Sequence, residues 1–267
     1  MLRVETAIQR VHRGNAVASA LKVAFFLAIV GCLLIGPTFP KLLALGAVLF
    51  AWIWLSFTSA RGSQIVADSP SLIASGQYEE AEQRIDQAIA SFSLFRIVKL
   101  QALHNLALLR HAQQRWQETA ILCRALLRQR LGPNRSLSRQ SHLILADALL
   151  EMSDLPGAYQ AMINLYRQRL PLSEVLSLLL VQLDYESRVG AWQEMMRAIE
   201  MKVQLAELMP TQQSARAQAL LALAAMKMGR QDWADWLRQR AQLLAEPQRI
   251  CADRPNLGEL WNISQAD

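Results

Sequence analysis

The chain has 267 residues, of which 52% are hydrophobic and 19% charged, and its formal net charge is +6. The basic excess is local: residues 1–61 hold six Lys or Arg against one acidic residue, whereas residues 62–267 hold 22 basic and 21 acidic residues. A near-neutral body is a poor binder of polyanions, so we expect no nucleic-acid partner. The three cysteines, Cys32, Cys123 and Cys251, lie far apart and indicate neither a disulfide framework nor a metal-ligand motif.

Residues 1–15 form a basic amphipathic N-terminal segment. Apolar positions alternate with Arg3, Arg10 and Arg13 at helical spacing, and the segment ends at Gly14-Asn15. The pattern fits two structures, a short helix lying on anionic lipid and a frayed basic tail.

Two apolar blocks follow, Ala16 to Gly36 and Leu42 to Phe57. Each approaches the ~20 residues that a bilayer-spanning helix needs when its flanks are included. Between them, Gly36–Lys41 contains two prolines and a glycine, which interrupt a continuous helix. The sequence therefore predicts a transmembrane helical hairpin over residues 16–60, with the lipid bilayer as a partner.

Two other interpretations of the first block have to be weighed. A cleaved signal peptide would explain the basic start, but no small-x-small cleavage site with a polar continuation precedes the second block. The stretch Ile29–Cys32 is similar to a bacterial lipoprotein box, which would make Cys32 a lipidated terminus. However, Leu33-Leu34-Ile35 follow where a polar tether is expected.

The basic flanks predict the orientation of the hairpin. Three arginines precede it and Arg61 follows it, whereas the short loop holds Lys41 alone. Because cytoplasmic flanks carry an excess of Lys and Arg, both ends should be cytoplasmic. We expect an integral protein of a bacterial cytoplasmic membrane with the rest of the chain on the cytoplasmic side. The bias is only a few residues, so the inverted arrangement stays open.

The later chain repeats one pattern. Gly76-x-Tyr78-x-x-Ala81 opens an apolar seam that continues with Ile85 and Ala88. The slot of Tyr78 is filled again downstream, at intervals of 38, 39, 37 and 41 residues, by Trp116, Leu155, Trp192 and Trp233. The seam residues after the second, third and fourth slots are Thr119, Cys123 and Leu126; Ala158, Met162 and Leu165; and Met195, Ile199 and Lys202.

A large-then-small pair precedes the slots at a constant distance. Leu106-Ala107, Leu145-Ala146 and Leu223-Ala224 each lie ten residues before a slot, and the fourth unit has Gln182-Leu183 instead. Such an offset indicates a leading helix that packs against the helix beginning at the slot.

These features resemble the tetratricopeptide repeat (TPR) family. The resemblance covers residues 62–247 and implies an all-α solenoid of about five helical hairpins whose concave groove binds protein. The family's common period is about 34 residues, so loops or helix ends must absorb the excess. Residues 248–267 then form a C-terminal tail, either a cap that packs Trp261 on the last unit or a short partner-binding motif.

Some TPR domains grip a partner's carboxylate with Lys and Asn on successive leading helices, and that clamp is not matched here. The corresponding faces supply a candidate partner-binding set that suits a less anionic or mainly apolar ligand. Its members are His104, Asn105, Leu108, His111 and Asp147.

No acidic residue occurs from Thr119 to Ala146, and five arginines fall in this stretch. Such an edge fits an acidic peptide or lipid headgroups, and it also fits a simply solvated surface. This candidate basic edge consists of Arg124, Arg128, Arg130, Arg135 and Arg139.

Catalytic motifs are missing from the sequence. There is no glycine-rich phosphate loop after a strand and no Gly-x-Ser-x-Gly elbow. His104, His111 and His142 lie on neighbouring predicted helices, but they lack the spacing and companions of a helical zinc site, so polar lining explains them better. We therefore expect no enzyme activity, no catalytic residue, no cofactor, no metal and no small-molecule substrate.

The sequence thus predicts an all-α membrane protein with a two-helix transmembrane hairpin followed by a TPR-like α-solenoid. Its expected function is that of a membrane-anchored scaffold or assembly adaptor for protein partners. The alternative is a subunit of a membrane transport or envelope-biogenesis complex whose hairpin is itself functional. Small residues in the apolar blocks would permit close helix packing there, namely Gly31, Ala44, Gly46 and Ala47.

Overall fold

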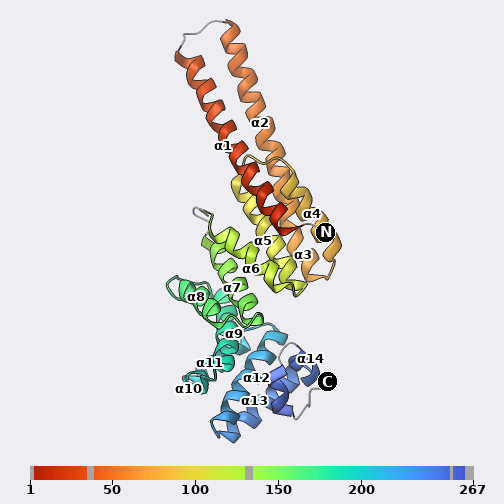
Figure 1. Ribbon diagram of the computed structural model, residues 1–267, viewed down its shortest axis with the longest axis vertical. Coiled ribbons are helices and arrows are strands. Elements are labelled where there is room, and N and C mark those ends of the chain that lie inside the picture. Colours follow the sequence, from red (N-terminus) through yellow and green to blue (C-terminus); the bar gives the residue numbers. More distant parts are fainter. Residues whose placement is uncertain (1–2, 35–38, 130–134, 253–254, 262–267) are drawn as a thin grey trace. The chain divides into compact units, whose positions relative to one another are not determined.

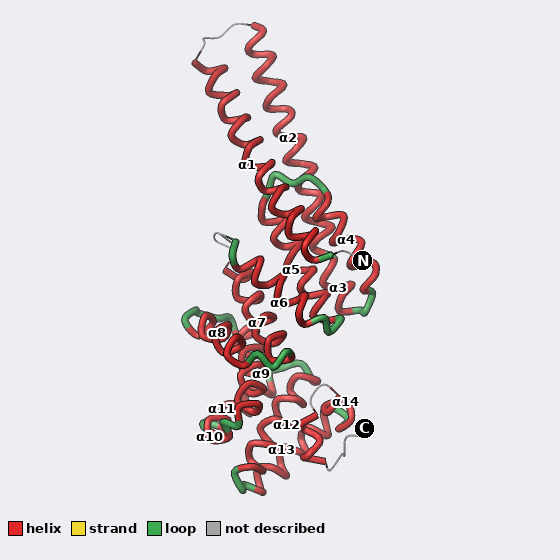
Figure 2. Tube along the Cα trace, in the orientation of Figure 1, coloured by secondary structure: helices red, strands yellow, loops and turns green. Residues whose placement is uncertain are grey.

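The computed structural model describes residues 3–34, 39–129, 135–252 and 255–261 of the chain. Within these ranges all regular structure is helical, with fourteen α-helices and one 3-10 helix (Figures 1 and 2). The all-α prediction is therefore confirmed for the described residues. The chain divides into two compact units, residues 1–148 and 149–267, and the division falls within α7 (Arg135–Glu151).

Unit 1 is built from helices that pack on their neighbours in sequence. They are α1 (Val4–Leu34), α2 (Phe39–Ala67), α3 (Ser69–Ala74), α4 (Tyr78–Ala90), α5 (Arg96–Ala112), α6 (Trp116–Leu127) and most of α7. Helix α3 starts directly after Asp68, its N-cap residue, and α2 ends at Ala67 just before it.

Unit 2 continues in the same manner, with α8 packing on α9 and α12 on α13. Its elements are α8 (Leu155–Tyr166), α9 (Leu172–Val189), α10 (Trp192–Met196), α11 (Ile199–Glu207), α12 (Thr211–Lys227), α13 (Gln231–Leu244), α14 (Pro247–Ala252) and the 3-10 helix η1 (Pro255–Trp261).

The basic start of the chain and the first apolar block form one continuous helix. Helix α1 runs without a break through Gly14-Asn15, where the sequence analysis ends the N-terminal region. Its first turns bury Val4, Ala7 and Val11, and α1 packs on α4, α5 and α6. The apolar positions that suggested a lipid-facing helix therefore belong to the core of unit 1. The reason is that three helices of the same unit offer them a complementary apolar surface.

One described helix is long and apolar enough to cross a membrane, over Val4–Gly31, and almost none of its most apolar window is buried. The predicted pair of spans over residues 16–60 is wrong in its second member. The described apolar stretch of α2 is Leu45–Phe57, shorter than the ~20 residues of a span. Beyond it α2 enters the packed body of unit 1, where Ser59 and Val66 are buried.

Helices α1 and α2 nevertheless lie side by side and extend beyond the rest of unit 1 (Figure 1). The rings of Phe25 and Trp52 meet edge to face with centroids 5.2 Å apart. Of the predicted break at Gly36–Lys41, residues 36–38 lie outside the described part, and α2 begins at Phe39 with Pro40 in its first turn.

The same turn joins successive helices five times. Each turn has one residue with positive φ, and that residue stands two positions before the next helix start. Its N–H donates to the carbonyl three positions back, and the next N–H donates to the carbonyl five positions back, over 2.8–3.3 Å. This bonding satisfies the last carbonyls of the preceding helix, as in a Schellman motif. The five residues are Gly76, Gln114, Ser153, Gly190 and Gly229.

These turns confirm four predicted slots and correct the fifth. Tyr78, Trp116, Leu155 and Trp192 are each the first residue of a helix. In the fifth unit the equivalent residue is Gln231, two positions before the predicted Trp233. The intervals between helix starts therefore become 38, 39, 37 and 39 residues, and the pair ten positions before the fifth slot is Leu221-Ala222. Tryptophan suggested the wrong position because Trp233 and Trp236 follow the turn closely.

The predicted seams are the buried faces of the second helices. Ala81, Ile85 and Ala88 are fully buried in α4, and the seam residues of α6, α8 and α10–α11 are buried as well. In the fourth unit the second helix is broken at Ala198, which has φ of +51°. Lys202 sits on the seam there because its Nζ donates to the carbonyls of Glu194 (2.6 Å) and Met195 (3.1 Å), which end α10.

The described part of the tail packs on the last helix pair. Helices α14 and η1 both contact α12. Leu257 and Leu260 are buried in the core of unit 2, and Trp261 is partly buried against it.

Two of the five turns carry a residue with a side chain in the left-handed region, at a cost that glycine avoids. Gln114→Gly and Ser153→Gly should therefore each raise the free energy of unfolding by about 1 kcal/mol, measured by urea denaturation of the detergent-solubilised protein. The neighbouring change Gln113→Gly is the control. Gln113 has φ of −82°, so glycine there should lower the stability. Equal effects of the changes at 113 and 114 would contradict this account.

Candidate functional site

The predicted partner-binding residues lie on α5 and α7 in unit 1. The two central ones are buried: His104 is only 4% exposed and Asn105 1%. Nδ1 of His104 lies 3.2 Å from Oγ of Ser141, and Nδ2 of Asn105 donates to the backbone oxygen of Val66 at 2.8 Å. These two side chains join α5 to α7 and α2. They do not line an open surface, and Leu108 beside them is half-buried.

His111 and Asp147 are the two predicted residues that the structure brings together. Nε2 of His111 lies 2.7 Å from Oδ2 of Asp147, and its ring meets Trp116 edge to face with centroids 5.1 Å apart. Both side chains are partly exposed. The pair joins α5, α6 and α7, and it is the part of the predicted set that a ligand could reach.

His104 and His142 are neutral at physiological pH because burial lowers the pKa of each. Burial lowers the pKa of His104 to about 4, against a weaker opposing hydrogen bond from Gln140. Burial also lowers the pKa of His142. His104 therefore offers no positive charge to an acidic ligand, and the three histidines are held by separate environments.

The candidate basic edge follows the end of α6 and the start of α7. Arg124, Arg128 and Arg135 are exposed, and Arg139 is half-buried. Arg130 lies outside the described residues. The described part of this edge thus places three exposed arginines on unit 1, and its role as a binding surface stays a prediction.

A buried arginine at the junction of α4, α5 and α6 was missed from the sequence. Arg110 is fully buried. Its guanidinium lies 2.9 Å from Glu82 and 3.1 Å from Glu118, and it donates to Oε1 of Gln113 at 2.8 Å. The two carboxylates come from α4 and α6, so no local pattern reveals the cluster. It clamps three helices together behind the exposed surface of unit 1.

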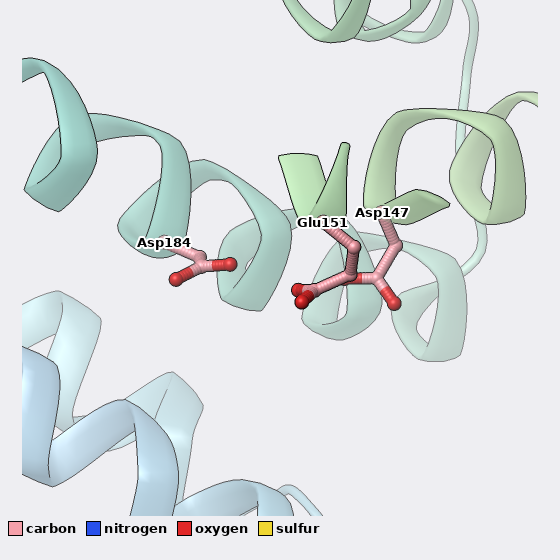
Figure 3. A group of neighbouring side chains, drawn as sticks. All are labelled: Asp147, Glu151 and Asp184. Carbon is pink, nitrogen blue, oxygen red and sulfur yellow. The ribbon is translucent and has the colours of Figure 1, made fainter. Parts of the chain in front are cut away.

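Carboxylates also gather near the start of unit 2. Figure 3 shows Asp147 and Glu151 one turn apart on α7, and Asp184 on α9. Within unit 2, oxygens of Glu151 and Asp184 come within 4.8 Å of each other, a spacing that a cation could bridge. A guanidinium already does so: Nη2 of Arg188 lies 3.0 Å from Glu151 and 3.3 Å from Asp184, and Arg216 adds a contact of 3.2 Å to Asp184. The group is an ion-pair network that ties α7, α9 and α12.

An exposed tyrosine cluster lies on α8 and α9 in unit 2. Tyr159 and Tyr185 stack with centroids 5.7 Å apart, and the hydroxyl of Tyr166 donates to Gln182 at 2.9 Å. Burial, followed by the charges of Glu186 and Tyr159, raises the pKa of Tyr166 to about 12, so its hydroxyl remains a donor. Tyr159 and Tyr166 each expose about half of their surface. Tyrosine is enriched among the residues that supply most of the binding energy at protein interfaces.

Comparisons with known proteins give no relative for this chain: no family model, no curated protein and no solved structure matches it.

Acidification should weaken unit 1 through His104. In the unfolded chain the imidazole binds a proton near pH 6.5, whereas in the folded chain it resists until about pH 4. The unfolded state therefore binds more protons between these values, and the free energy of unfolding falls by up to roughly 3 kcal/mol as the pH drops through this window. Denaturation curves of the wild type and of His104→Gln between these two pH values measure the effect. A variant with the same pH slope as the wild type would contradict it.

Loss of the Arg110 clamp should destabilise the protein strongly. Arg110→Met leaves two partly buried carboxylates without their guanidinium, so the free energy of unfolding should fall by on the order of 3 kcal/mol. The matched control is Arg84→Met, which breaks a 2.7 Å pair with Glu80 between half-exposed side chains and should cost less than about 1 kcal/mol. Denaturant midpoints compare the two, and similar losses would show that Arg110 is no special clamp.

Proposed function

We propose that this protein is a membrane-anchored adaptor that binds protein partners through TPR-like helix pairs. The observation that carries the proposal is the dual character of α1. Its first turns form part of the core of unit 1, and its later turns expose large apolar side chains, among them Val23, Phe26 and Leu27. A helix with this pattern links a folded body directly to a bilayer.

The packed start of α1 favours a retained anchor over a cleaved signal peptide. Removal of the apolar part of α1 would also remove Val4, Ala7 and Val11 from unit 1, which would leave the apolar faces of α4, α5 and α6 uncovered. Exposure of such a surface costs roughly 25 cal/mol per Å². We therefore expect α1 to stay attached to the folded body as an uncleaved anchor.

The TPR-like nature of the helix pairs is supported by their regularity. The same bonded turn occurs five times, and helix starts recur at nearly equal intervals. In such arrays each pair packs on its neighbours and presents side chains to ligands. We assign partner binding to the tyrosine cluster on α8 and α9, because the central residues of the set predicted on α5 are buried.

The membrane part of this proposal is tested by a charge in the exposed stretch of α1. Leu27→Arg should release a large share of the protein from membranes at alkaline pH, because an arginine in the apolar core costs about 2.5–3.5 kcal/mol. Leu172→Arg, at an equally exposed leucine of α9, should leave retention unchanged. Wild-type protein that washes off membranes as readily as Leu27→Arg would refute the anchor.

The partner-binding part is tested by affinity capture of full-length protein in mild detergent. The double change Tyr159→Ala and Tyr166→Ala should remove a specific partner that the wild type retains. The exposed residues Met201 on α11 and Leu208 at its C-cap, changed together to alanine, serve as the control. Partners that survive the tyrosine changes and vanish with the control would move the binding surface to α11.

A second function remains a candidate on one observation. Phe50 and Trp54 on α2 stack with centroids 6.4 Å apart, and both are exposed. An ordered aromatic face suits contact with another membrane subunit, as in a transport or envelope-biogenesis complex. Replacing the two rings by leucine retains apolar character, so a loss of assembly without a loss of membrane retention would favour this function.

A further inference from the structure

The loop between α4 and α5, residues Ser91–Phe95, is fixed where α1 and α2 extend beyond the rest of unit 1 (Figure 2). The N–H of Leu94 donates to Oγ of Ser59 on α2 at 2.9 Å, and both residues are buried. From α5, Nζ of Lys99 donates to the carbonyls of Ala88 (3.0 Å), Ile89 (2.6 Å) and Ser91. The loop is thus held by both α2 and Lys99.

The packed body of unit 1 ends at the same level on α1 and α2. These helices run in opposite directions (Figure 1). The ring of Phe25 on α1 contacts that of Trp52 on α2. Ala18 lies seven residues before Phe25 on α1, and Ser59 lies seven residues after Trp52 on α2. Both are on the side of the packed body, and both are buried. Beyond this level the two helices expose many large apolar side chains, and Lys22 is the one exposed charged side chain among the described residues. The apolar ones are Val23, Phe26, Leu27, Leu49, Phe50, Ile53, Trp54 and Phe57. The loop tied to Ser59 therefore lies at the start of the exposed apolar region.

Two aromatic rings point outward from this loop. Phe92 is 39% exposed and Phe95 44%, although Leu94 between them is buried. Burying these two rings in an apolar phase would release free energy, at roughly 25 cal/mol per Å² of apolar surface removed from water. Rings at the edge of an apolar region are placed as interfacial side chains of membrane proteins are.

The charges of unit 1 are sorted along its helices. Unit 1 holds sixteen basic and eight acidic residues. Most of the acidic residues lie at the helix ends away from the Ser91–Phe95 loop: in the first turns of α1, α4 and α6, at the end of α2 and late in α7. The eight are Glu5, Asp68, Glu79, Glu80, Glu82, Asp86, Glu118 and Asp147.

The loop end carries basic residues instead. Arg96 donates to Oε1 of Gln129 at 2.7 Å, and Nε2 of Gln129 lies 2.9 Å from Nε2 of His12. These contacts bring the start of α5, the end of α6 and α1 together, and place Arg13 and Arg128 next to the contacting residues in sequence. Both are exposed. No acidic residue occurs from Gln87 to Gln117 or from Thr119 to Ala146.

We infer that the loop end of unit 1 lies on the surface of an anionic bilayer, with Phe92 and Phe95 inserted among the headgroups. The inference rests on the proposed membrane attachment through α1. Positive charge near the surface is attracted to anionic lipid within a Debye length, and acidic residues are kept away from it. Lys22 lies one turn beyond Ala18, where its long side chain reaches back to the same headgroups. Arg13 and the described exposed arginines of the basic edge, Arg124, Arg128 and Arg135, then contact lipid headgroups.

Fluorescent labels on full-length protein test this arrangement. In a background with Cys32 and Cys251 changed to serine, single cysteines are introduced as Phe92→Cys, Phe95→Cys, Leu27→Cys and Ser75→Cys, and each is labelled with an environment-sensitive dye. Cys123 is buried, and burial raises its pKa to about 12, so it does not react. The proteins are reconstituted into vesicles of phosphatidylcholine and phosphatidylglycerol. Ser75 is exposed in the turn at the far end of α4 and serves as the matched control.

The labels at 92 and 95 should be quenched by iodide several-fold less than the label at 75. They should respond most to a lipid-borne quencher near the headgroups, whereas the label at 27 should respond to a quencher in mid-bilayer. Iodide access at 92 and 95 equal to that at 75, with 27 still protected, overturns this inference and leaves the anchor intact. Iodide access at 27 overturns the anchor itself. Equal protection at 92 in vesicles of phosphatidylcholine alone refutes the role assigned to the arginines.

Discussion

The helix pairs of this protein depend on one backbone constraint, the left-handed residue that ends each leading helix. At five positions the chain reverses by placing a single residue at positive φ, and the same two hydrogen bonds close each turn. A reversal so short forces the next helix to lie against the one before it. The seam residues are buried as a consequence, since the two helix faces that meet are set by the length of the turn. At Gln114 and Ser153 the chain adopts this conformation without glycine, so packing of the helices overrides the local preference.

Polar side chains in the interior serve the same architecture. Arg110 joins three helices through two carboxylates, and Asp184 with Arg188 and Arg216 joins helices of unit 2. Lys99 and Lys202 each place a buried ammonium on the final carbonyls of a helix. Buried charges persist only when such partners are present. The buried charged groups named above therefore serve to hold helices together.

Much of the fold could be read from the sequence, since spacing reports local structure. The all-helical class, the seams and four helix starts follow from the 3.6-residue period and from large residues after short turns. The fifth start was misplaced because two tryptophans compete for the slot. The second membrane span was wrong for a tertiary reason, and the start of α1 packs on protein for the same reason. Whether an apolar face meets lipid or protein depends on what packs against it, and Val4, Ala7 and Val11 give no local sign of the helices that cover them.

The candidate site was harder to predict for the same reason. Sequence spacing shows which face of a leading helix a side chain lies on. It does not show that His104 contacts Ser141 and that Asn105 donates to the backbone of Val66, residues 37 and 39 positions away. Arg110 depends on partners from two other helices. The arginine run of α6 and α7 was visible because it needs no partner to be recognised, only a stretch of sequence without acidic residues.

Because α1 is continuous, the direction in which its outer side chains point is fixed relative to the packed body of unit 1. One face of this helix is held by α4, α5 and α6 near Val4, Ala7 and Val11, and another face further along carries the exposed apolar side chains. Each residue turns an α-helix by about 100°, so inserting or deleting one residue near Ala18 would turn the outer face by that angle relative to the body. Evolution can therefore lengthen this helix without reorienting unit 1 only by steps close to whole turns. The number of residues between the two faces is therefore constrained by the structure.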